Sequence, residues 1–149
     1  MKTESEINVF VNGVLHYFNT SVQQTAECGT PHLAIGRNPD VSDYTGMIKI
    51  TGKRSGMVFF TAPKGMLSVM LMRMQETDMS HDNLCDLVGE IANTLSGNAR
   101  RDFGSQFNIS VPSVVHGRGT QLEYPEKTRP IIVPIEWRTY HARLVVCLD

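Results

Sequence analysis

The sequence predicts an α+β domain in which helices cover an antiparallel β-sheet. Three segments carry apolar residues at the three- and four-residue spacing of helices with one buried face. Two short apolar runs flank a glycine-bracketed polar turn, and a series of short apolar runs separated by Pro and Gly closes the chain. At 149 residues the chain has the length of one domain, so we expect a single domain over residues 1–149.

The first predicted element is a helix over residues 6–19. Its apolar residues recur at helical spacing and define one face: Ile7, Phe10, Val11, Val14, Leu15 and Phe18. A polar stretch rich in Gly and Pro follows over residues 28–43, with only short apolar pieces such as residues 33–35.

Residues 47–51 and 57–60 are predicted to form a β-hairpin around the turn 52–56. Lys53 and Arg54 in this turn could contact a phosphate, although a solvated loop is the simpler interpretation.

Pro63 is expected to begin a second helix, because its fixed φ and missing N–H do no harm there. This helix carries a stripe of methionines and leucines: Met66, Leu67, Met70, Leu71 and Met74. The stripe could form an adaptable binding surface, but the spacing favours core packing.

The last third of the chain is predicted to contain strands over residues 107–115, 119–124, 131–137 and 142–148. Pro112 and Pro134 fall within these runs. Because proline cannot donate a hydrogen bond to a β-ladder, we expect both at sheet edges or bulges.

The third predicted helix begins at Ser80, a good N-cap, and runs to about Arg100 or Phe103. At 100° per residue one narrow arc collects its buried residues: Leu84, Leu87, Val88, Ile91 and Leu95. A stripe on the opposite side collects Asp86, Glu90, Asn93 and Gly97. Glu90 and Asn93 are three residues apart, so their side chains are neighbours that point into solvent.

This polar stripe could simply be the solvated face of an amphipathic helix. Two features favour a function instead. Asn is a mediocre helix former, and Gly89 and Gly97 cost about 1 kcal/mol each relative to Ala in a helix interior. Because glycine has no side chain, positions 89 and 97 would leave the helix backbone open to close approach by another surface. Spacing alone does not decide between the two interpretations.

The motif Asp86-x-x-x-Glu90-x-x-Asn93, together with its surroundings over residues 89–99, resembles the signature helix of the CheC/CheX/FliY chemotaxis phosphatases. In that family an acidic or serine residue precedes a Glu, which precedes an Asn, at this spacing. Residues 109–117, which include Pro112, resemble the strand that follows in the family.

The order of elements over nearly the whole chain is also similar to that of CheX. Residues 7–14 resemble the CheX opening and carry no Glu-x-x-Asn. CheC proteins typically carry two such motifs, so the single motif here favours the CheX branch.

The resemblance implies a CheC-like fold: an antiparallel, bifurcated sheet covered by about three helices, with a pseudo-repeat of α-β-β units. It also implies a phosphatase that acts on the aspartyl phosphate of a CheY-like response regulator. Asn93 would orient the attacking water, and Glu90 would bind the receiver's lysine. Asp86, Gly89 and Gly97 would contact the partner.

By the same resemblance we expect no cofactor in the chain itself, since the receiver supplies Mg²⁺, and a homodimer that joins edge strands. The chain could instead be a CheX-like module that docks a receiver without catalysis. It could also be a purely structural oligomer subunit, in which case Glu90 and Asn93 would be buried at a subunit contact.

The net charge, the cysteines, the histidines and the first ten residues bear on other possible functions and on the location of the protein. The net charge of −1 and the lack of a basic tract argue against nucleic-acid and membrane-surface binding. Three cysteines without CxxC spacing predict buried thiols, and the five histidines, which show no ligand spacing, are expected to be scattered. The first ten residues lack the layout of a signal peptide, so we expect a cytoplasmic protein.

Overall fold

The computed structural model describes residues 4–34 and 39–149. The helices are α1 (Glu4–Tyr17), the π-helical turn η1 (Phe18–Val22), α2 (Lys64–Arg73) and α3 (His81–Phe103). The strands are β1 (Glu27–Cys28), β2 (His32–Leu33), β3 (Tyr44–Gly52), β4 (Gly56–Ala62), β5 (Phe107–Ile109), β6 (Ser113–His116), β7 (Ile131–Trp137) and β8 (Tyr140–Leu148).

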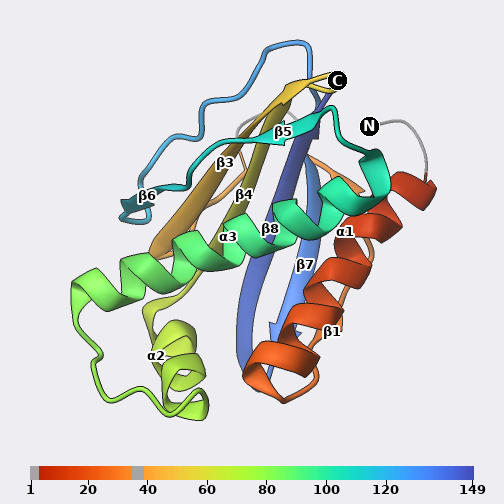
Figure 1. Cartoon of the computed structure of the whole chain (residues 1–149). Coiled ribbons are helices and arrows are strands. Elements are labelled where there is room, and N and C mark those ends of the chain that lie inside the picture. The colour runs from red at the N-terminus through yellow and green to blue at the C-terminus, as the bar shows by residue number, and fades with distance from the viewer. Residues whose placement is uncertain (1–3, 35–38) are drawn as a thin grey trace.

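One antiparallel sheet contains all of these strands, in the order β1-β7-β8-β4-β3-β5. Both outer positions are split between two short strands, because β2 also pairs with β7 and β6 also pairs with β3. In Figure 1, α3 crosses one face of the sheet, with α1 beside it and α2 near one end. The predicted α+β fold with a bifurcated antiparallel sheet is confirmed.

The chain consists of two similar halves, which is the expected pseudo-repeat. A helix, two short strands and a hairpin follow in the order α1-β1-β2-β3-β4, and the order α3-β5-β6-β7-β8 repeats it. The hairpins meet at β4 and β8 in the centre of the sheet. The short strands are exchanged: β1 and β2 pair with β7 of the second half, and β5 and β6 pair with β3 of the first. These exchanged strands cover most of both outer strands.

The main core lies between the helices and the sheet and includes the predicted apolar faces of all three helices, except Leu15 of α1, which is partly exposed and outside the core cluster. Met66, Leu67, Met70 and Leu71 of α2 are buried, which confirms that the methionine stripe packs in the core. A second, smaller cluster occupies the opposite face of the sheet: Val41, Phe59, Leu122, Val145 and Cys147. Because β4 and β8 are apolar on both faces, the chain must cover the second face as well.

The predicted strand over residues 119–124 is wrong. In the structure residues 117–130 contain no strand and run over the second face of the sheet, where Leu122 is buried and Tyr124 packs beside it. The alternating apolar residues that suggested a strand are the contacts of a covering segment.

The predicted strand over residues 107–115 is divided into β5 and β6 by residues 110–112. Both pieces pair with β3, at different ends. Pro112 lies in the break, as its missing N–H requires. Pro134 lies inside β7, in the interval between the residues paired with β1 and β2, and its carbonyl oxygen accepts a hydrogen bond from the Gly29 N–H at 2.9 Å.

Arg54 in the hairpin turn is bonded to residues near both ends of the sequence, whereas a solvated loop was expected. Its guanidinium forms an ion pair with Glu6 of α1, donates a hydrogen bond to the Asp149 carbonyl oxygen at 2.7 Å and lies over the Phe103 ring. The predicted stretch over residues 28–43 includes positions 35–38, which lie outside the described residues. No helix in the described part of the chain is long and apolar enough to cross a membrane.

Candidate functional site

Helix α3 is fixed between α1 on one flank and the β5–β6 segment on the other, above β3 and β4. Ser80 is its N-cap, and the Ser80 hydroxyl accepts a hydrogen bond from the Asn83 N–H at 3.3 Å. The buried face matches the predicted arc, since all five of its residues are at most 3% exposed. The N-cap and the helix end at Phe103 are likewise confirmed.

Gly46 of β3 sets how closely α3 approaches the sheet. A Cβ at this position would lie 2.4 Å from the Val88 carbonyl oxygen and 3.2 Å from the Ala92 Cβ. Only hydrogen fits there, so the α3 backbone rests directly on the strand. Because this side of α3 contacts the sheet, the opposite side of the helix faces solvent.

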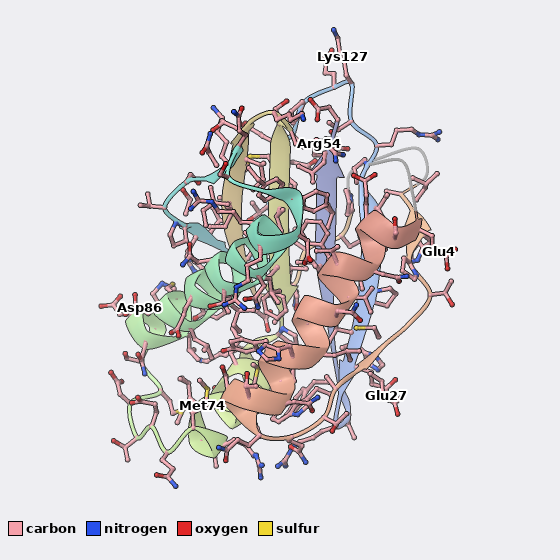
Figure 2. The ribbon with its side chains drawn as sticks, turned by 45° about the vertical axis from the view of Figure 1, so that its right-hand side comes forward. Glu4, Glu27, Arg54, Met74, Asp86 and Lys127 are labelled. Carbon is pink, nitrogen blue, oxygen red and sulfur yellow. The ribbon has the colours of Figure 1, made fainter. Side chains whose placement is uncertain are left out.

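The polar stripe of α3 is on the surface, as the helical spacing predicts. Asp86, Glu90 and Asn93 are exposed and Gly97 is partly exposed. Figure 2 shows Asp86 on the outer side of the N-terminal half of this helix. Within residues 4–34 and 39–149, the side chains of Glu90 and Asn93 form no hydrogen bond or salt bridge, so both can engage another molecule.

Gly89 is not on this open surface, in contrast to its expected place at a partner contact. It is buried, and a Cβ there would lie 3.1 Å from Val114 Cγ2 and 3.5 Å from Pro112 Cβ. The surface that approaches the helix at Gly89 therefore belongs to the chain's own β5–β6 segment. Gly97 is different, because a Cβ there would meet only Ile109 Cδ1, at 4.0 Å.

The β5–β6 segment places an apolar side chain on the rim of the stripe. Val111, which precedes the Pro112 that packs on Gly89, is 83% exposed. Its backbone is held, because the Ser110 N–H donates to the Lys49 carbonyl oxygen at 2.9 Å and the Lys49 N–H donates to the Ser110 hydroxyl at 2.9 Å. An exposed apolar side chain is thus held next in sequence to the proline that packs on α3 at Gly89.

A cluster that the sequence did not indicate lies at the N-terminal end of α3. The rings of His81 and His116 are 4.6 Å apart, and the Tyr44 hydroxyl lies 2.8 Å from His81 Nδ1. These residues are far apart in the sequence, so the expectation of scattered histidines is wrong for this pair. Among the described residues no group of three or more His, Cys, Asp or Glu is arranged to hold a metal ion.

The cysteines are free, but only Cys147 is fully buried, whereas all three were expected to be. Cys85 is partly exposed, and its Sγ lies 3.6 Å from His81 Nε2. Burial, together with the nearby carboxylates of Asp82 and Asp86, raises the pKa of the Cys85 thiol. Because a raised pKa favours the neutral thiol, Cys85 is a poor nucleophile.

A family model described as "Chemotaxis phosphatase CheX" matches residues 44–136, more than half of the chain. The chain belongs to the CheX family. The matched region includes α3 and therefore both Glu90 and Asn93. Among curated protein sequences, none matches at a significant level.

Solved structures with the same fold are similar to this CheX-family chain over nearly its whole length. A CheC-like superfamily protein from Shewanella sp. PV-4 has a TM-score of 0.85 at 24% identity and 99% coverage of both chains. CheX from Vibrio vulnificus has a TM-score of 0.83 at 22% identity, covering 97% of this chain and 99% of that one. A CheX–CheY–BeF3–Mg²⁺ complex from Borrelia burgdorferi has a TM-score of 0.76 at 15% identity, with 97% of both chains covered.

Proposed function

We propose that this CheX-family chain accelerates hydrolysis of the aspartyl phosphate on a CheY-like receiver domain. One observation supports this most directly: Glu90 and Asn93 stand side by side on the exposed stripe of α3, and neither is bonded to another described residue. The structure of CheX in complex with CheY from Borrelia burgdorferi, which shares the fold, supports a receiver as the partner.

Hydrolysis of the aspartyl phosphate requires few catalytic groups from this chain. On the receiver, Mg²⁺ and a lysine already stabilise the charge on the transferring phosphoryl group. A water molecule placed in line with the breaking bond is the missing component. The Asn93 amide can orient that water, because it offers both a donor and an acceptor without ionisation.

Glu90 acts as the anchor in this proposal. As a carboxylate one turn from Asn93, it accepts a charge-assisted hydrogen bond from the receiver's lysine and fixes the docked geometry. Asp86 and Gly97 extend the same stripe at either end and would border the contact, whereas Gly89 supports it from within by accommodating Pro112 and Val114.

The direct test mixes the chain with phosphorylated receivers encoded nearby and follows the lifetime of the phosphate. The proposal expects at least one lifetime to shorten. If no lifetime changes while a receiver still binds, the chain is the non-catalytic docking module instead. If no receiver binds, both the phosphatase proposal and the docking-module alternative are wrong.

Replacing Glu90 by Gln should weaken docking more than it slows the chemical step. The substitution removes the charge but keeps the size, so we expect the half-saturating receiver concentration to rise about tenfold, with kcat within about threefold. Asp86→Asn is the matched control, because it removes a carboxylate one turn earlier on the same stripe. Equal effects of the two substitutions would mean that net charge, not a specific anchor, governs docking.

We also infer that two copies of the chain associate through edge strands. β6 pairs with β3 on one side and with no described strand on the other, and it lies at the margin of the sheet in Figure 1. An unpaired edge can add a strand from a second copy. Light scattering should give twice the 16.6 kDa mass of one chain, and Ser113→Lys on this edge should lower that value. A wild-type mass of one chain would contradict the dimer.

A further inference from the structure

Tyr17, the last residue of α1, carries a buried hydroxyl that nothing described so far uses. Its side chain is 2% exposed, and within the described residues its hydroxyl has no hydrogen-bond partner. A buried hydroxyl without a partner costs free energy that a phenylalanine at the same position would avoid. Packing alone therefore does not explain why this residue is a tyrosine and not a phenylalanine.

The packing of α1 on α3 shows what lies opposite Tyr17. The helices run in opposite directions. The rings of Phe10 and Phe103 are 6.0 Å apart. About one turn further along α1, a Cβ added at Gly13 would lie 3.8 Å from Leu95 Cδ2, which precedes Phe103 on α3. Tyr17 follows Gly13 by about one turn of α1, and Glu90 precedes Leu95 by five residues, about one and a half turns of α3.

The electrostatics of the phenol agree with this placement. Burial raises the pKa of Tyr17 far above its usual value, and the negative charge of Glu90 raises it further. The phenol is therefore protonated at neutral pH and can donate a hydrogen bond. A carboxylate can only accept one, so the two groups are complementary.

We propose that Tyr17 is a positioning residue for Glu90, holding its carboxylate through a hydrogen bond from the buried hydroxyl in the orientation that meets the receiver's lysine. In the structure the hydrogen bond is not formed, so the proposal requires the exposed Glu90 side chain to rotate about its χ angles toward the Tyr17 hydroxyl. Fixing this side chain before docking lowers the entropic cost of binding. The role in docking rests on the function proposed above.

Tyr17→Phe tests the inference with little risk to folding, because the ring that packs edge-on against Phe18, with centroids 5.8 Å apart, is kept. The probe is a CheY-like receiver loaded with beryllium fluoride and Mg²⁺, whose binding does not depend on turnover. We expect Kd to rise about fivefold, with kcat within about twofold. In a Glu90→Gln background the same substitution should change Kd much less, and in an Asn93→Ala background it should keep its full effect.

A second measurement needs no receiver. In the free protein, Tyr17→Phe should move the NMR signal of the Glu90 side-chain carboxyl carbon and leave that of Asp86, the matched exposed carboxylate, in place. If no receiver binds, the proposed function fails, and this signal still decides whether Tyr17 contacts Glu90. The inference is overturned if the Glu90 signal does not move, or if the effect on Kd is equally large when Glu90 is already Gln.

Discussion

Asn93→Ala is expected to remove nearly all of the acceleration of receiver dephosphorylation while leaving the fold intact. A 100-fold acceleration corresponds to lowering the barrier by about 2.7 kcal/mol, which one well-oriented water can supply. Alanine can neither donate to that water nor accept from it. The phosphate lifetime should therefore return close to that of the receiver alone, while receiver binding, which relies on Glu90, should change little.

Asn12→Ala is a matched control, because Asn12 is also an exposed asparagine in a helix, on α1 rather than α3. It should leave the phosphate lifetime shortened as in the wild type. Thermal unfolding should show that neither variant is destabilised, since alanine is the better helix former. Undiminished acceleration in Asn93→Ala would remove Asn93 from the mechanism.

Gly46→Ala is expected to cause the largest loss of stability. The added Cβ would lie 2.4 Å from the Val88 carbonyl oxygen, a contact that no rotation of a side chain can relieve. Either α3 moves off the sheet or β3 distorts, and overpacking of this kind costs about 3 kcal/mol. Urea denaturation should show this loss. Because α3 carries Glu90 and Asn93, the activity should fall as well.

Gly97→Ala provides the control for Gly46→Ala. It adds the same methyl group to α3 itself, where the nearest atom lies 4.0 Å from the new Cβ. Removing a glycine from a helix interior should stabilise the protein by up to about 1 kcal/mol. If both variants were equally stable, the close approach of α3 to β3 would not govern the position of the site.

The burial of particular residues explains which sequence-based predictions held. The limits and buried face of α3 follow from contacts within a few residues, such as the Ser80 cap, and these local patterns predicted them correctly. The prediction of a strand over residues 119–124 was wrong because a segment that covers a sheet shows the same alternation of apolar and polar residues as a strand within it. Gly89 was misplaced because its neighbours, Pro112 and Val114, lie more than twenty residues further along the chain.

The sequence by itself determined the helices, the first hairpin, the last two strands and the exposed pair of Glu90 and Asn93, because each depends on residue patterns that are local in the chain. Only the tertiary structure decided that the short strands are exchanged between the halves, and that Gly46 lets α3 rest on β3. It also decided that the Tyr17 hydroxyl is buried without a hydrogen-bond partner among the described residues, within the electrostatic influence of Glu90. These are contacts between distant segments, and they are fixed by how helices and strands pack, which no local pattern of residues encodes.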